Sequence, residues 1–116
     1  MVARRSYVPK RGDAVWLSFD PQAGHEQAGR RPAVVLSPEA YNGKVGLAIL
    51  CPITNQVKGY PFEVAIPVGY AVSGVVLADQ VKSMSWERRH TSLRCSVPAG
   101  VLREAKAKIK ALLQIT

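Results

Sequence analysis

The stretch AVWLSF, at residues 14–19, alternates apolar side chains with side chains of mixed character. Its second, fourth and sixth residues, Val15, Leu17 and Phe19, fall on one side of an extended chain. This period of two is typical of a β-strand with a buried face. The segment that follows, residues 20–30, holds glycines, a proline and several polar side chains, and therefore predicts a loop.

Further short strands are expected beyond this loop. Apolar runs rich in β-branched residues recur along the chain, separated by proline, glycine and polar residues. The candidates are residues 33–36, 45–51, 62–66, 74–77 and 93–97. Strands this short and this closely spaced favour a small barrel or sandwich.

A short helix is expected between residues 36 and 45. Ser37 stands where an N-cap residue is preferred, and Pro38 suits the first position of a helix. Asn42 and Gly43 predict that this helix ends within about one turn.

The last segment predicts a longer helix, opened by Pro98. Its apolar residues recur at intervals of three and four, the spacing of one helical face, and basic residues fall on the other side. The apolar positions are Leu102, Ala105, Ile109, Leu112 and Leu113, and the basic positions are Arg103, Lys106 and Lys110. We expect an amphipathic C-terminal helix packed on the barrel.

Length and composition indicate a single domain at residues 1–116, because the chain is short and 47% of its residues are hydrophobic. No apolar run could span a bilayer, and no apolar region follows the basic residues near the N-terminus, so no signal peptide is expected. Cys51 and Cys95 lie in apolar stretches without CxxC spacing and are predicted to be buried free thiols. A cytoplasmic protein is expected.

The charge of the chain is strongly positive. Sixteen Lys and Arg residues face eight Asp and Glu residues, for a formal net charge of +8. Such an excess suits an anionic partner, and a solvated basic surface is an equally good interpretation of charge alone. The basic residues form several small clusters along the chain rather than one tail.

The residues offer little support for metal or cofactor chemistry. His25 and His90 are not spaced as a pair of metal ligands, and no phosphate-binding glycine loop or GxSxG elbow is present. A metal-dependent nuclease usually needs several convergent carboxylates, and the acidic residues here are scattered. We expect neither a metal nor a cofactor. If the chain cleaves RNA, the substrate 2′-hydroxyl must be the nucleophile, which requires a proton acceptor, a proton donor and a cation.

Three longer motifs carry a family resemblance. They are GDAVWLSFDPQAGHEQAGRRPAVVLSPEAYN (residues 12–42), KGYPFEV (residues 58–64) and VVLADQVKSMSW (residues 75–86). In this order they resemble the MazF/PemK-type toxin endoribonucleases of bacterial type II toxin–antitoxin systems. The resemblance implies an SH3-like small β-barrel of the PemK/CcdB-like type, a symmetric homodimer, cleavage of single-stranded RNA and restraint by a MazE-like antitoxin.

The family's loop motif, E-Q-x-G-x-R-P, is matched by Glu26, Gln27, Gly29, Arg31 and Pro32. Its arginine is the main catalytic residue of the family, which implies that role for Arg31. A guanidinium group can hold a phosphate through two parallel hydrogen bonds. Glu26 is the candidate base for the 2′-hydroxyl, and a solvated carboxylate or a partner that orients Arg31 is the alternative.

The resemblance implies two further catalytic residues. Thr54 matches a strand-end threonine that helps to hold the scissile phosphate, with a turn-forming role as the alternative. His25 is matched in some relatives, and a histidine titrates near neutrality, as a proton donor would. Some members pair Asp79 with an arginine two residues earlier, but Leu77 stands there in this chain. Asp79 is therefore predicted to be structural, bonding backbone amides.

Other polar residues are predicted to contact the substrate because polar groups of this kind read unpaired base edges in single-stranded RNA. These candidates are Gln27, Arg30, Asn55, Gln56 and Lys58. Trp16 and Trp86 could stack on bases, but core or dimer packing is the favoured role of both.

The resemblance thus implies a toxin that cleaves mRNA without a metal, leaves 2′,3′-cyclic phosphate and 5′-hydroxyl ends, and inhibits translation. An acidic antitoxin is the expected partner. Two alternatives stay open: a CcdB-like toxin that binds a topoisomerase and cuts nothing, and a basic barrel that binds RNA without cleaving it. The loop with Glu26 and Arg31, together with Thr54, favours the ribonuclease.

Overall fold

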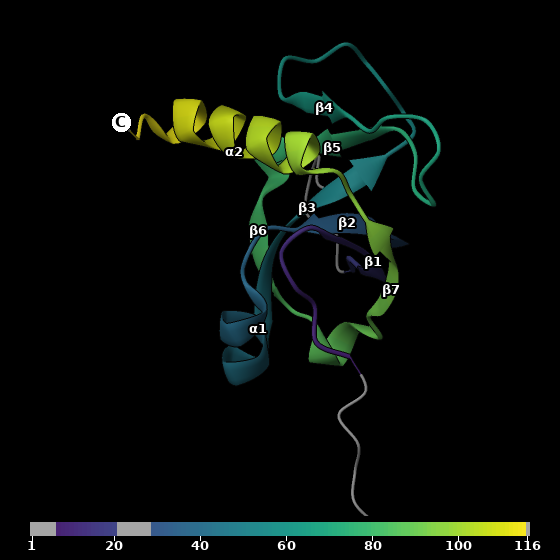
Figure 1. Ribbon diagram of the computed structural model, residues 1–116, viewed down its shortest axis with the longest axis vertical. Coiled ribbons are helices and arrows are strands. Elements are labelled where there is room, and N and C mark those ends of the chain that lie inside the picture. The colour runs from purple at the N-terminus through teal and green to yellow at the C-terminus, as the bar shows by residue number, and fades with distance from the viewer. Residues whose placement is uncertain (1–6, 21–28, 116) are drawn as a thin grey trace, which may run out of the picture.

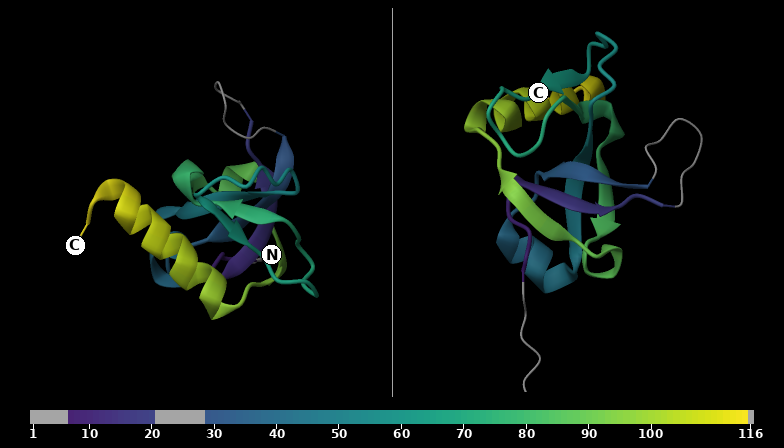
Figure 2. Two further views of the ribbon diagram at one scale, coloured as in Figure 1. Left: turned by 90° about the horizontal axis from the view of Figure 1, so that it is seen from above. Right: turned by 90° about the vertical axis from the view of Figure 1, so that its right-hand side faces the viewer.

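A curved antiparallel sheet forms the body of the protein, with one helix across each end (Figures 1 and 2). The computed structural model describes residues 7–20 and 29–115. The strands are β1 (Asp13–Ser18), β2 (Arg30–Val35), β3 (Leu47–Thr54), β4 (Glu63–Ala65), β5 (Val75–Leu77), β6 (Lys82–Ser85) and β7 (Ser92–Ser96). The helices are α1 (Glu39–Val45) and α2 (Ala99–Leu113), with short 3-10 turns η1 (Ala78–Gln80) and η2 (Glu87–Arg89). The expectation of a mainly β fold with a C-terminal helix is confirmed.

Strand β3 organises the sheet, whose order is β4-β5-β3-β2-β1-β7. One edge of β3 pairs with β2, with Ala33 opposite Pro52. The other edge pairs with β6 near the start of β3 and with β5 near its end, where Thr54 lies opposite Val75. The two ends of β3 therefore meet different strands, and the end with Thr54 lies beside β5 and the turn η1.

The core has two layers, on opposite faces of β1 and β2. Val15, Leu17 and Phe19 pack in one layer, together with Trp86. Ala14 faces the other layer, which includes buried residues of α2. The alternation expected at residues 14–19 is confirmed, because side chains on a strand point to opposite faces in turn.

The first helix is longer than the sequence predicted. It runs over Glu39–Val45 and ends at Gly46, whose φ of 81° is left-handed, so the expected end at Asn42 and Gly43 is wrong. The cause is burial of the Asn42 side chain, whose Nδ2 donates to the carbonyl oxygens of Pro9 (2.8 Å) and Ser37 (3.0 Å). A side chain held by such bonds does not compete with the helix backbone.

Ser37 does not cap this helix, contrary to expectation. Pro38 is the N-cap residue and has no side-chain capping bond. The Ser37 hydroxyl instead donates to Asn42 Oδ1 (2.6 Å) and accepts from the amide of Ile49 (2.8 Å). Trp86 donates its indole N–H to the Asn42 carbonyl (3.0 Å) and is buried, which confirms core packing for this tryptophan.

Two strand predictions need correction. The third strand begins at Leu47 rather than at residue 45, because α1 occupies the residues before it, and it extends to Thr54. Strand β6 was not predicted, since Met84 is its one buried apolar residue. This strand forms because its backbone pairs with β3, and the sequence pattern of β6 gives no sign of that pairing.

The C-terminal helix covers the sheet as far as Ile109, which is partly buried against the core, but not with its last turn. Val101 and Ala105 are buried, whereas Leu112 and Leu113 are exposed. Figure 1 shows the end of α2 extending beyond the sheet. The expected packing of this helix on the barrel is therefore confirmed for its first turns and wrong for its last ones. In the part of the chain that the structure describes, no helix combines the length and apolar character needed to cross a bilayer.

The two cysteines are free thiols in different surroundings. Cys51 is buried in the core, as expected. Cys95 is only half-buried, because it lies on β7 at the edge of the sheet.

Candidate active site

Arg31 and Thr54 lie at neighbouring strand ends. Strands β2 and β3 are antiparallel, with Ala33 opposite Pro52. Strand β2 begins at Arg30 and β3 ends at Thr54, so Arg31 and Thr54 lie near neighbouring ends of the two strands. Arg31 pairs with Leu17 of β1, which fixes its backbone at this end of the sheet. A permanent cation and a hydroxyl group therefore come from adjacent strands at the same end of the sheet.

The hydroxyl of Thr54 is oriented by the chain that follows it. Its side chain is buried, and Oγ1 accepts a hydrogen bond from the amide of Gln56 (3.1 Å). The hydroxyl proton can still be donated to a ligand, because this bond uses only a lone pair. Gly74 packs closely against this turn: a Cβ atom there would lie 2.1 Å from the Thr54 carbonyl oxygen.

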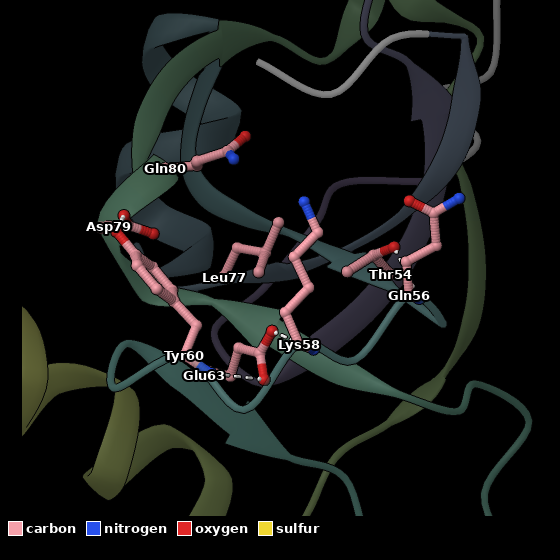
Figure 3. A pocket seen from close by; sticks show the side chains of 8 residues that line it. All are labelled: Thr54, Gln56, Lys58, Tyr60, Glu63, Leu77, Asp79 and Gln80. Atoms are coloured by element: carbon pink, nitrogen blue, oxygen red, sulfur yellow. Dashed lines mark hydrogen bonds between the residues drawn. The ribbon is translucent and has the colours of Figure 1, made fainter. Parts of the chain in front are cut away.

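A cavity of about 360 Å³ opens beside Thr54 (Figure 3). Seven of its eight lining residues are polar or charged, which is the chemistry of a hydrogen-bonding ligand site rather than of a core void. The lining residues are Thr54, Gln56, Lys58, Tyr60, Glu63, Leu77, Asp79 and Gln80. They come from the end of β3, the segment before β4, the first residue of β4, and the β5–η1 corner. Figure 3 shows the Lys58 amino group projecting into the space between Gln80 and Thr54.

Glu63 shapes the segment that carries Lys58. Its carboxylate accepts hydrogen bonds from three successive backbone amides, those of Lys58 (3.0 Å), Gly59 (3.1 Å) and Tyr60 (3.3 Å). The left-handed backbone of Gly59, with φ of 75°, allows these amides to converge. Glu63 therefore acts within the chain and is not available as a base.

Tyr60 and Asp79 join the two walls of the cavity. The Tyr60 hydroxyl donates to Asp79 Oδ2 (2.5 Å), and this bond to a carboxylate raises the pKa of Tyr60 above its ordinary value. The expected bonds from Asp79 to backbone amides are not found in the described residues, where the buried Oδ1 has no hydrogen-bond partner.

Asp79 also acts on the thiol of Cys51. Burial, and then the charge of Asp79, raise the pKa of the Cys51 thiol to about 12.

Comparison with known proteins decides the family. Residues 10–113 match the model of the PemK-like, MazF-like toxins of type II toxin–antitoxin systems. The chain belongs to this family. The endoribonuclease toxin MazF of Escherichia coli strain K12 is 51% identical over 113 residues, which cover 97% of this chain and 99% of that toxin. The endoribonuclease PemK of Escherichia coli is 31% identical, with 97% of this chain and 87% of PemK covered.

Solved structures of MazF-like toxins show the same fold. MazF of Deinococcus radiodurans matches with a TM-score of 0.92 and 55% identity, covering 95% of this chain and all of that one. A MazE–MazF structure from the same organism gives a TM-score of 0.87 and 54% identity, covering 96% and 100%. The expected PemK-like fold is confirmed, and family membership places the chain among the endoribonuclease toxins.

The residues predicted from the MazF-like motifs fall into three groups. Thr54, Gln56 and Lys58 line one cavity, and Arg31 lies near the start of the adjacent strand β2 without lining that cavity. Glu26, Gln27 and His25 lie outside the described residues. Arg30 and Asn55 are placed elsewhere: the Arg30 guanidinium donates to the carbonyl oxygens of Arg89 (3.3 Å) and His90 (2.9 Å), and Asn55 accepts from the Ser73 hydroxyl (2.9 Å).

Five cavity residues were not predicted as site residues, namely Tyr60, Glu63, Leu77, Asp79 and Gln80. Tyr60 and Glu63 belong to the KGYPFEV motif, and Gln80 follows Asp79 in the VVLADQVKSMSW motif. The two motifs were the signal in the sequence that could have pointed to these residues. The residues within each motif do not show that the two segments share a cavity. Antiparallel pairing of β4 with β5 brings them together.

Proposed function

We propose that this MazF-like protein is a metal-independent, sequence-selective endoribonuclease that cleaves single-stranded mRNA in the cytoplasm and thereby inhibits translation. The observation that carries the proposal is the polar cavity beside Thr54, at the end of β3 that adjoins the start of β2, where Arg31 lies. A cation and an oriented hydroxyl donor from adjacent strand ends suit a phosphate with developing negative charge.

In the proposed reaction the substrate 2′-oxygen attacks the adjacent phosphorus. The new 2′-O–P bond closes a cyclic phosphate, and the bond to the 5′-oxygen of the next nucleotide breaks. Glu26 takes the 2′-hydroxyl proton, and His25 gives a proton to the leaving 5′-oxygen. Both assignments rest on the family motif. Arg31 neutralises the phosphorane-like transition state, and the Thr54 hydroxyl donates to a nonbridging oxygen.

The cavity beside Thr54 binds a base next to the cleaved bond. Its volume of about 360 Å³ is within the range of small-ligand sites. Gln56 and Gln80 offer amide donors and acceptors, and Lys58 offers a cation, so that a base edge can be read by hydrogen bonds. Arg30 and Asn55 lie outside this cavity, so any contact they make is with another part of the RNA.

The protein acts as a homodimer restrained by an acidic, MazE-like antitoxin. A groove between α2 and β3 is lined by apolar residues, among them Ile49 and Ile109, with basic residues of α2 at its side. Leu112 and Leu113 at the end of α2 are exposed as well. A second copy related by a two-fold axis would cover such an apolar face. Two related structures from Deinococcus radiodurans are of MazE–MazF, and the net charge of +8 suits an acidic partner.

Incubation of a long RNA with the protein tests the function. Cleavage should proceed undiminished in excess EDTA, leave 2′,3′-cyclic phosphate and 5′-hydroxyl ends, and fail on a substrate with a 2′-deoxy sugar at the cut site. An intact RNA would favour the CcdB-like or the RNA-binding alternative. Loss of cleavage in EDTA, or normal cleavage of the deoxy substrate, would refute the mechanism.

A further inference from the structure

The outer face of β1 carries an aromatic side chain stacked between arginines. Trp16 is half-buried, and the guanidinium carbon atoms of Arg94 and Arg30 lie 4.9 Å and 5.8 Å from the centroid of its ring. The arginines come from β7 and β2, which flank β1 on its two sides. Side chains from three strands thus form one positively charged cluster around the indole, the guanidinium–indole layer, and these distances are within the range of cation–π interactions.

The two arginines are held differently. Arg30 donates to the carbonyl oxygens of Arg89 and His90, so its guanidinium is largely committed to the protein. Arg94 is exposed, and its contact with Trp16 is the interaction that the structure gives for it. Stacking on the indole leaves the hydrogen-bond donors of a guanidinium free at its rim. Arg94 is therefore the cation that an incoming anion would meet.

A second cavity connects this layer with the catalytic strand end. It has a volume of about 190 Å³, and its lining includes Trp16, Pro32, Asn55, Ser73 and Arg94. Asn55 follows Thr54 directly, so consecutive residues at the end of β3 line the two cavities. The Asn55 Oδ1 atom accepts from the Ser73 hydroxyl (2.9 Å), which leaves its amide nitrogen to donate to a ligand.

We propose that this cavity, the Trp16–Arg94 pocket, binds a nucleotide of the RNA that flanks the cleaved bond. The base stacks on the guanidinium–indole layer, Arg94 donates to the flanking phosphate, and Asn55 Nδ2 donates to the base edge. The inference rests on the proposed ribonuclease function. A carboxylate of an acidic peptide would satisfy Arg94 but would not use the stacking surface, which is why RNA is the occupant.

Binding of uncleavable RNAs tests the pocket directly. The cut site is first mapped on a long RNA, and three analogues with a 2′-deoxy sugar at that site are made: a core of a few nucleotides, the core extended on its 5′ side, and the core extended on its 3′ side. One extension should tighten binding to the wild type by on the order of 10-fold, the contribution of one stacked base. Arg94→Ala should abolish that gain and leave binding of the core unchanged.

The salt dependence distinguishes a phosphate contact from stacking. With the extended RNA, Arg94→Ala should lower the slope of log affinity against log salt by about 0.7, the value for one phosphate contact with a single strand. Arg94→Lys should keep this slope but lose most of the stacking gain, because an ammonium group is not planar. Trp16→Phe should keep part of the gain.

Lys44→Ala is the matched control, since it removes one exposed positive charge from α1, at the opposite end of β3. It should leave both the gain and the slope unchanged.

A gain that survives in Arg94→Ala, or the absence of a gain from either extension, would overturn the pocket assignment. An Arg94→Ala protein that loses affinity for an acidic antitoxin peptide but not for extended RNA would assign the pocket to a protein partner instead. Failure of the wild type to cut the long RNA would contradict the ribonuclease itself, which is a separate outcome.

Discussion

The hydroxyl of Tyr60 donates a hydrogen bond of 2.5 Å to Asp79, across the mouth of the cavity beside Thr54. Tyr60 belongs to the segment between β3 and β4, and Asp79 belongs to η1 after β5. This bond and the turn around Glu63 hold the segment with Lys58 in one position. Lys108 of α2 adds a third attachment, because its Nζ donates to the Pro61 carbonyl (2.6 Å).

Removal of the Tyr60 hydroxyl should weaken RNA binding more than it slows chemistry. Tyr60→Phe keeps the ring contact with Phe62 but loses the bond to Asp79. Since hydrogen bonds to charged groups are the stronger ones, we expect KM to rise on the order of 10-fold with kcat nearly unchanged. Steady-state cleavage of a fluorogenic RNA measures both constants. Equal losses in kcat for Tyr60→Phe and Arg31→Ala would contradict a positioning role.

The same bond predicts a dependence on high pH. The hydrogen bond to Asp79 raises the pKa of Tyr60 above the ordinary 10.0, so folding favours the protonated phenol. The hydrogen bond from Tyr60 to Asp79 should therefore be complete below about pH 10. It should be lost as the pH rises through the raised pKa that Tyr60 has in the folded protein. Absorbance of tyrosinate, compared between the wild type and Tyr60→Phe, reports this ionisation. Asp79→Asn should return the pKa of Tyr60 toward its ordinary value, and an unchanged titration would argue against the bond.

Arg31 and Thr54 should differ in how much they contribute to catalysis. Arg31→Ala should lower kcat on the order of 100-fold, because it removes the cation that stabilises the transition state. Thr54→Ala should cost less, and Thr54→Ser should recover most of that loss because the hydroxyl is kept. Single-turnover cleavage measures these effects, with Lys44→Ala as the control for loss of charge. Full activity in a folded Arg31→Ala protein would refute the assignment.

Gly74 should be essential to the shape of the site for a reason separate from its backbone conformation. Both Gly74 and Gly59 have positive φ, 103° and 75°, but only Gly74 has a neighbour, the Thr54 carbonyl oxygen, within 4 Å of an added Cβ atom. Gly59→Ala should cost about 1–2 kcal/mol in unfolding free energy for its φ alone. Gly74→Ala should cost about 1–3 kcal/mol more, because the strand end must shift. Urea denaturation compares the two, and equal costs would show that the close approach is unimportant.

An acidic antitoxin segment should compete with RNA. If electrostatic attraction to a chain of net charge +8 speeds its capture, the affinity of such a peptide should fall as salt rises. The peptide should also displace a short uncleavable RNA analogue in a fluorescence titration. Simultaneous and independent binding of peptide and RNA at every salt concentration would show that inhibition does not occur by competition.

Local pattern in the sequence determined which elements form and which faces they bury. The alternation of Val15, Leu17 and Phe19 predicted a strand with one face in the core, and the spacing of Ala105 and Ile109 predicted the C-terminal helix. The motif around Arg31 and the strand-end Thr54 indicated the chemistry. The strand and helix inferences succeed because period and residue type are set within a few neighbouring residues, whereas the roles of Arg31 and Thr54 stay predictions.

Only the tertiary structure decided which side chains meet. The pairing of β2 with β3 brings the strand ends with Arg31 and Thr54 to the same end of the sheet, the corner after β5 brings Asp79 to Tyr60, and the pairing of β1 with β7 stacks Arg94 on Trp16. Each pair joins segments that are distant in sequence, and no local pattern records the partner. The same reason explains the errors at α1 and β6, where the buried Asn42 side chain and pairing with β3 override the local signal.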